Sequence, residues 1–250
     1  MAKMDLINLK TFLHKDLQLV YTTNNCYGIV VDSVTKKLLW TEKGKTLEDL
    51  EVGTFRYENV TTYAINKEFT LLPTALLADE KARDYLKYTT NLSVNDLVLI
   101  DKEELSKIAL IWALKKEVKD EITSKHKQAV FHNFINSLIA RSNGFTDTNR
   151  IVTFFAEDLL IILVSKNGMF QFVNLFEIES IEDALYYHLL TLQSLEVDEN
   201  EVSVYTGGFY NDMDRFLVKM SSYFSKVNRF TTNPIEGTEQ DFIDLASIIN

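Results

Sequence analysis

The sequence is poor in cysteine, proline and glycine, with one, two and eight of these residues among its 250. The single cysteine, Cys26, excludes a disulfide within the chain and is typical of a protein from a reducing compartment. Glycine and proline fall below their usual shares of about 7% and 5%, which leaves few positions for glycine-built phosphate loops. Neither a nucleophile-elbow, a P-loop nor a dinucleotide-binding glycine pattern occurs in the chain.

Basic residues are fewer than acidic ones: the chain has 26 Lys and Arg and 36 Asp and Glu, which gives a net charge of -10. Affinity for nucleic acid comes mainly from Lys and Arg side chains on phosphates. A strongly acidic chain without a basic run therefore predicts no nucleic-acid partner. The excess of carboxylates is typical of a solvated surface that keeps a protein soluble.

Long hydrophobic runs are missing as well. The longest purely apolar run, Leu159 to Val164, is far shorter than the roughly 20 residues that cross a bilayer. Near the N-terminus, Asp5, Lys10 and Lys15 interrupt the apolar residues, so no signal-peptide core is expected there. These features predict a cytoplasmic protein with no membrane span.

What the sequence does contain is a β-rich pattern that occurs twice. Each half opens with three apolar runs separated by polar turns, which predicts a β-meander: residues 17–22, 27–31 and 38–41, then 151–155, 159–164 and 169–175. Shorter runs predict further strands at 61–65, 69–72, 97–100, 108–112 and 128–131. The repeated pattern predicts an internally duplicated α/β protein, with residues 1–145 as the first half and 146–250 as the second.

Helices are predicted after several of these strands. Asn133 is a suitable N-cap for a helix that ends near Asn143 and Gly144, and Pro73 is expected to begin a turn into another helical segment. In the second half, a helix near residues 181–192 precedes a strand at 202–206, the Gly207-Gly208 turn and a helix near 213–220. At the C-terminus, Phe242, Leu245 and Ile249 share one helical face, which favours either folding back on its own domain or docking of a partner.

The segments FTLLPTALL, KQAVFHNFINSLIARSNG, IVTFFAEDLLIILVSKNGMFQFVNLFEIES and EDALYYHLLTLQSLEVDENEVSVYTGGF carry a resemblance. They resemble an uncharacterised bacterial family, a domain of unknown function whose members have an actin-like ATPase fold. The resemblance implies two ribonuclease-H-like subdomains, each opening with a β-meander, on either side of a cleft. The wider superfamily includes actin, sugar kinases, heat-shock ATPases and the actin-like assembly proteins of cell division and type IV pili.

The resemblance also indicates where a nucleotide would bind, because active members hold its phosphates with one β-hairpin from each subdomain. These hairpins usually carry an acid, which holds Mg²⁺ through water, and a glycine, which admits phosphate oxygens to the backbone. Here the first tip is formed by Thr22, Thr23, Asn24 and Asn25, which include neither an acid nor a glycine. The second tip has Glu157 and Asp158 but no glycine.

A third element, the adenosine-type turn, corresponds to Thr206, Gly207 and Gly208. Its glycines could admit an adenine or a ribose, or could serve only the backbone of a turn. ATP with Mg²⁺ is the cofactor that the resemblance implies, and the altered hairpin tips do not favour it.

No other pattern adds a chemistry. The four histidines and the cysteine show no metal-ligand spacing, so no metal site is predicted. Asp32 and Asp101 end predicted strands, where either a catalytic acid or ordinary turn chemistry is common. No residue is predicted to be catalytic. The leading hypothesis is a non-catalytic protein that works through an unidentified protein partner; the alternative is a nucleotide-binding ATPase or small-molecule kinase that uses the cleft.

Overall fold

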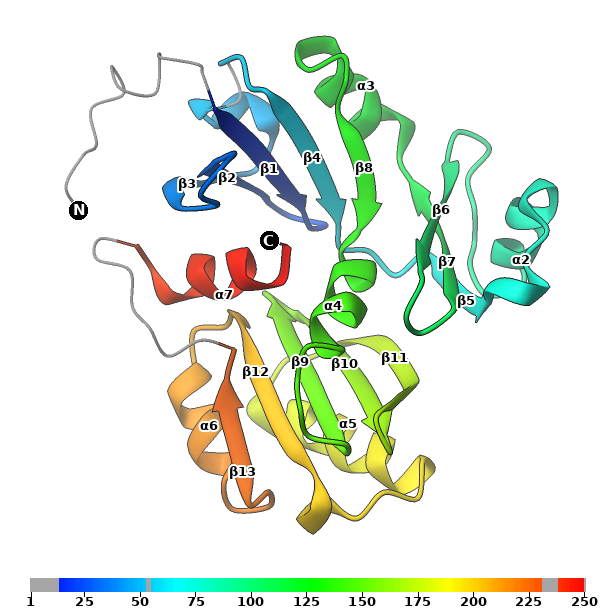
Figure 1. Cartoon of the computed structure of the whole chain (residues 1–250), viewed down its shortest axis with the longest axis vertical. Helices are drawn as coiled ribbons and strands as arrows, with labels where there is room; N and C mark the ends of the chain where they lie inside the picture. Colours follow the sequence, from blue (N-terminus) through cyan, green and yellow to red (C-terminus); the bar gives the residue numbers. More distant parts are fainter. Residues whose placement is uncertain (1–13, 53–54, 231–237, 250) are drawn as a thin grey trace. The chain divides into compact units, whose positions relative to one another are not determined.

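The computed structural model describes residues 14–52, 55–230 and 238–249 (Figure 1). The chain divides into two compact units, the first ending at Asn136 and the second running from Ser137 to Ile249. Helix α4 (Phe134–Ser142) passes through the junction. The domain boundary expected between residues 145 and 146 stays a prediction. The prediction that no signal peptide is present relied partly on Asp5 and Lys10, and both residues lie outside the described part of the chain.

The first unit is built around a five-stranded sheet in the order β3-β2-β1-β4-β8. Its strands are β1 (Lys15–Tyr21), β2 (Cys26–Asp32), β3 (Leu38–Gly44), β4 (Asn59–Ala64) and β8 (Val130–Asn133). The first three strands are antiparallel neighbours, whereas β4 is parallel to β1 and β8 is parallel to β4. The meander predicted for this half is therefore confirmed.

The second unit repeats this sheet with the order β11-β10-β9-β12-β13. Its strands are β9 (Arg150–Ala156), β10 (Leu159–Lys166), β11 (Met169–Glu177), β12 (Ser203–Phe209) and β13 (Lys226–Arg229). The antiparallel and parallel pairings follow the same pattern as in the first sheet. Even the irregularity is repeated, because the middle strand of each meander shifts register, at Val30/Val31 and at Val164/Ser165. The predicted internal duplication is confirmed.

Local sequence explains where several elements begin and turn. The Asn133 side chain accepts a hydrogen bond from the Ile135 N–H at 2.9 Å, which confirms it as the N-cap of α4. Ser180 and Asp183 form a capping box at the start of α5 (Ile181–Ser194). Between β10 and β11, Asn167 and Gly168 both adopt positive φ, as a tight two-residue hairpin requires.

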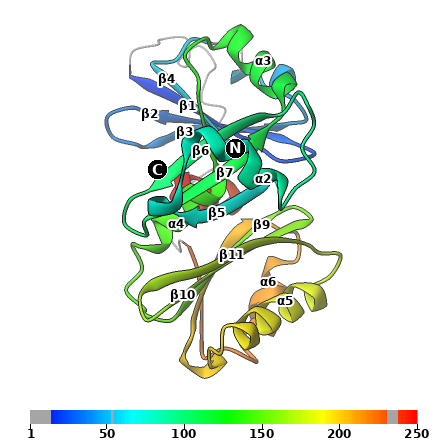
Figure 2. The same cartoon turned by 90° about the vertical axis from the view of Figure 1, so that its right-hand side faces the viewer.

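Each sheet buries one face under helices of its own unit. In the first unit, Leu17, Leu19 and Val60 pack with Ile122 of α3 (Lys116–Lys125). In the second, α5 and α6 (Met213–Met220) lie together on one side of the sheet (Figure 2) and close over a core that contains Phe155. Helix α7 (Gln240–Ile249) packs on β12.

Helix α7 lies on the opposite face of that sheet, because residues alternate between faces along a strand. Val204 of β12 belongs to the core under α5 and α6, whereas Phe209, an odd number of residues away, contacts Phe242 of α7 edge-on. Phe242, Leu245 and Ile249 are all buried. The tail residues that the structure describes thus fold back on their own unit.

A third, smaller sheet is inserted in the first unit between β4 and α3. Its order is β5-β7-β6, formed by β5 (Phe69–Pro73), β7 (Ile108–Leu114) and β6 (Leu97–Glu103), and α2 (Ala82–Lys87) packs against it. The helix expected directly after Pro73 begins later, because short 3₁₀ turns occupy residues 74–76 and 79–81 first. In the described part of the chain, no helix is long and apolar enough to cross a membrane.

Candidate functional site

The tip of the first hairpin is a four-residue loop between β1 and β2. The Thr22 hydroxyl accepts hydrogen bonds from the N–H groups of Asn25 at 3.0 Å and Asn24 at 3.3 Å. The Thr22 N–H in turn donates to the Asn25 carbonyl at 2.9 Å. These bonds close the loop on itself, so the Thr22 side chain serves the local fold of the hairpin.

Beside this tip the first unit has a hollow of about 370 Å³, which we call the hairpin hollow. Thr22 and Thr23 line it, together with polar side chains from the segments that follow β4 and β7 and from the loop before β6, namely Asn66, Glu68, Asp96 and Lys115. Asn24 and Asn25 are not part of the lining. The hairpin hollow has the size of a small-molecule site, and it brings hydroxyls, carboxylates and one ammonium together.

The tip of the second hairpin is the two-residue turn Glu157-Asp158, as predicted. Glu157 adopts a positive φ of 65°, and its N–H donates to the Phe209 carbonyl at 3.1 Å. The Asp158 carbonyl accepts from the Ile178 N–H at 2.9 Å. The backbone of this tip is therefore tied to β12 and to the end of β11 within the second unit.

The Gly207-Gly208 turn predicted between a strand and a helix is wrong, because β12 continues through both glycines to Phe209. The strand extends because β9 is long enough to pair with it, Phe154 opposite Gly207 and Phe155 opposite Gly208. Thr206, Gly207 and Gly208 are all buried.

Close packing explains why glycines stand at these two positions. A Cβ on Gly208 would lie 2.2 Å from the Phe155 carbonyl oxygen, and the residue has a φ of 108° that side chains rarely allow. A Cβ on Gly207 would lie 2.5 Å from the Phe230 ring and 2.7 Å from the Asp244 carboxylate. The positions that these two Cβ atoms would occupy are filled by the chain itself, so its own packing requires glycine at both places.

The Asp244 carboxylate is the group that faces these glycines. Strand β13 ends at Arg229 and does not pair with β12 at Gly208. The Gly208 N–H donates instead to Asp244 Oδ2 at 3.2 Å. Arg229 Nη2 lies 3.1 Å from the same oxygen, and Gln240 donates to Oδ1 at 3.0 Å. Burial raises the pKa of Asp244, while its hydrogen bonds to Gln240 and Arg229 oppose that rise. A buried side chain of the protein thus accepts the backbone N–H that the resemblance associates with a nucleotide.

Two strand-associated acids have different roles. The Asp32 carboxylate accepts bonds from the N–H groups of Val34 and Thr35, which is turn chemistry. Asp101 lies inside β6 and is buried; it accepts the Asn133 N–H at 2.7 Å and faces His132 Nδ1 at 2.8 Å. That hydrogen bond raises the pKa of His132.

The candidate residues thus fall into two groups. Thr22 and Thr23 line a hollow in the first unit, whereas Glu157, Asp158 and Gly208 are neighbours at one end of the second sheet. Sequence reasoning named Asp101 but missed its pairing with His132, and it missed the contacts of Asp244 with Arg229 and Gly208, because these partners meet only through contacts between distant segments. Among the residues that the structure describes, no group of three or more His, Cys, Asp or Glu side chains could hold a metal ion.

The fold defines the class of protein. The chain is similar to a Bacteroides thetaiotaomicron VPI-5482 protein with an actin-like ATPase fold and unknown function, with a TM-score of 0.80 and 15% identity over 98% of this chain and 99% of that one. The predicted fold class, an actin-like ATPase fold, is therefore confirmed. The chain belongs to the family described as Protein of unknown function (DUF3822), whose model matches residues 14–227.

Two further structures share the fold at lower similarity. One is a PilM–PilN type IV pilus biogenesis complex, with a TM-score of 0.60 and 12% identity over 94% of this chain and 96% of that one. The other is the cytoplasmic domain of EpsL, an inner membrane component of the type II secretion system of Vibrio cholerae, with a TM-score of 0.52 and 8% identity over 94% and 93% of the two chains. None of the curated proteins matches this sequence.

Proposed function

We propose that this chain is a non-catalytic protein of the actin-like fold that acts through protein–protein contacts. The observation that carries the proposal is the bond between the Gly208 N–H and Asp244 Oδ2 at 3.2 Å. A backbone N–H can contact a nucleotide only if it is free, and here a buried carboxylate already accepts it.

The two hairpin tips support the same proposal. Neither tip has a glycine, and the Thr22 hydroxyl is engaged by its own loop at 3.0 Å. Glu157 and Asp158 offer carboxylates that could hold Mg²⁺, but the positions that would contact phosphate oxygens lack the small residues such contact needs. These residues therefore do not fit ATP with Mg²⁺, and no catalytic step is assigned to them.

The names of two structural neighbours favour protein contacts over catalysis. One neighbour was solved in a PilM–PilN complex, and the other is a component of a secretion system. Both are proteins that work in assemblies, so a relative with the same fold and an altered nucleotide site is a reasonable candidate for an assembly role.

Nucleotide binding and turnover test the proposal. A ligand present at 100 times its Kd stabilises a protein by about 2.7 kcal/mol, which raises Tm by roughly 5–10 °C for a chain of this length. We expect no such shift with millimolar ATP or ADP and Mg²⁺, and no phosphate release above the buffer rate. Phosphate release by the wild-type protein that is abolished in Glu157→Gln/Asp158→Asn, with an unchanged Tm in that variant, would overturn the proposal.

The alternative function is a nucleotide-dependent ATPase or a small-molecule kinase. The hairpin hollow favours it, since about 370 Å³ lined by Thr23, Lys115 and Asp96 would accept a phosphorylated small molecule. Lys115→Gln separates the two functions. A nucleotide-induced rise in Tm that this variant loses, while Lys116→Gln keeps it, would place binding in the hairpin hollow.

A further inference from the structure

A second hollow lies in the first unit, on a different set of residues from the hairpin hollow. It has a volume of about 570 Å³ and is lined by residues 56–61, 125–130 and His132. These segments are the approach to β4, the beginning of β4, and the connection from α3 into β8. We call this feature the basic hollow, because its charge is opposite to that of the chain as a whole.

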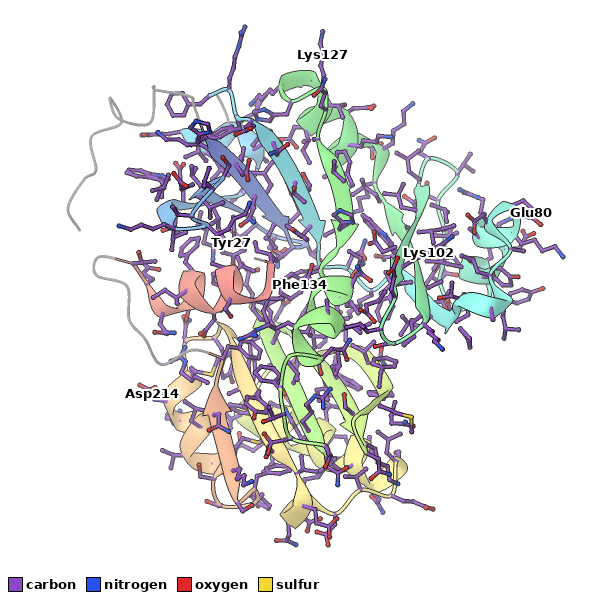
Figure 3. All side chains as sticks on the ribbon, viewed as in Figure 1. Tyr27, Glu80, Lys102, Lys127, Phe134 and Asp214 are labelled. Atoms are coloured by element: carbon purple, nitrogen blue, oxygen red, sulfur yellow. The ribbon has the colours of Figure 1, made fainter. Side chains whose placement is uncertain are left out.

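Three exposed cations surround the basic hollow, namely Arg56, Lys125 and Lys127. Within the part of the chain that the structure describes, none of their side chains forms a hydrogen bond or an ion pair. Lys127 projects outward into solvent from the end of α3 (Figure 3). Charged groups without a partner on an otherwise acidic protein are free to bind an anion.

The single acid in the lining does not neutralise them. Glu58 Oε2 accepts the Ser33 hydroxyl at 3.0 Å and lies 3.9 Å from His14 Nδ1. Counting fixed charges, three cations and one carboxylate leave the basic hollow at +2, in a chain of net charge -10.

Two other lining residues, Val130 and His132, indicate what kind of anion fits the basic hollow. Val130, which is 51% exposed, adds an apolar surface to the lining. His132 is held by Asp101 through Nδ1 at 2.8 Å, so its Nε2 is the ring nitrogen left for a ligand. The basic hollow thus combines an exposed valine, an imidazole held by Asp101 and three exposed cations.

We propose that the basic hollow binds an acidic, partly apolar peptide segment of a partner protein. This inference rests on the proposed function, since it names the surface through which the protein contacts would be made. The positive charge of the basic hollow is complementary to the carboxylates of such a segment. Its long exposed cations would attract an oppositely charged segment toward the site.

The same features disfavour other anions. A small-molecule site buries most of its ligand and holds it with converging polar groups, whereas Arg56, Lys125 and Lys127 are exposed and their side chains are unrestrained. A nucleic acid needs many phosphate contacts, and an excess of two positive charges on a strongly acidic protein provides few.

Fluorescence anisotropy with a defined probe tests the proposal. The probe is a short fluorescein-labelled peptide of alternating Glu and Leu, and the control peptide has Gln in place of Glu. We expect the Glu peptide to bind at least tenfold more tightly, which corresponds to about 1.4 kcal/mol, and its affinity to fall as NaCl is raised.

Matched variants locate the binding. Arg56→Gln/Lys125→Gln/Lys127→Gln should weaken the Glu peptide at least tenfold. The control Lys37→Gln/Lys81→Gln/Lys116→Gln removes the same charge from exposed lysines elsewhere in the first unit and should change affinity less than twofold.

Several results would overturn the proposal. One is an equal loss of peptide affinity in the two triple variants, and another is tighter binding of an oligonucleotide than of the peptide. The others are displacement of the peptide by millimolar inorganic phosphate, and self-association that only Arg56→Gln/Lys125→Gln/Lys127→Gln abolishes. ATP turnover in the assays described above would refute the proposed function. Failure of the wild-type protein to bind the Glu peptide, without ATP turnover, would refute only the assignment of the basic hollow as the binding surface.

Discussion

Replacing Gly208 by alanine should destabilise the second unit severely. Gly208 lies within β12 at a φ of 108°, and its missing Cβ would fall 2.2 Å from the Phe155 oxygen and 2.9 Å from the Phe155 nitrogen. Both atoms belong to the backbone of the neighbouring strand β9, so no side-chain rotation can relieve the clash.

Two effects set the size of the loss. A non-glycine residue in a sparsely populated backbone region costs about 1–3 kcal/mol. Forcing a methyl group into a closed space costs about 1–3 kcal/mol more, because β9 and β12 would have to separate. The expected decrease in the free energy of unfolding is therefore about 2–6 kcal/mol.

Urea denaturation followed by circular dichroism measures this change. Gly168→Ala is the matched control, since Gly168 also has a positive φ, 77°, but nothing lies within 4 Å of its added Cβ. That variant should lose only the backbone strain of about 1–2 kcal/mol. Equal losses in the two variants would refute the packing argument. The same reasoning means that a substitution at Gly208 cannot serve as a test of nucleotide binding, because it would unfold the site it was meant to block.

Two further predictions concern buried titratable side chains. His188 is fully buried, and its ring lies between Thr153 Oγ1 at 2.7 Å and the Ala184 carbonyl at 2.6 Å. Burial lowers the pKa of His188 to about 4, whereas a histidine in the unfolded chain titrates near 6.5. The protein should therefore lose up to about 3 kcal/mol of stability as the pH falls from 6.5 to 4. His188→Gln should reduce that acid-dependent loss in urea titrations repeated across this pH range, and an unchanged slope would contradict the assignment. Burial raises the pKa of the Cys26 thiol to about 12, so Cys26 should react with Ellman's reagent only after denaturation, and rapid labelling of the native protein would show that the thiol is accessible.

The sheets could be predicted from the sequence because their strands are strongly patterned. Leu159 to Val164 is a continuous apolar run, and the structure buries all six residues in β10 between two neighbouring strands. Asn133 precedes an apolar helical face, which is the position an N-cap takes, and it caps α4. In both cases the signal lies in adjacent residues, so it can be found without tertiary contacts.

The candidate site could be predicted only in part, because tertiary contacts decide it. Two glycines after a strand predict a turn, but pairing with β9 extends β12 through them. The carboxylate that faces them, Asp244, is separated from Gly208 by 36 residues and reaches it only when α7 folds onto β12. No local pattern marks an aspartate on the apolar face of a helix as the partner of a distant N–H.

The duplication itself explains why the fold does not determine the chemistry. The two sheets share strand order and pairing, so Tyr63 in β4 and Gly208 in β12 occupy corresponding places one residue before the end of the ladder. Yet the Tyr63 ring lies tilted against the His132 ring, with 6.0 Å between the ring centroids, while the Gly208 N–H donates to Asp244. Strand pairing constrains the backbone of both copies equally, but it leaves the residues at strand ends and hairpin tips free to diverge. Those are the residues that the resemblance associates with a nucleotide, so the shared fold does not by itself determine whether a chain of this class carries ATPase activity.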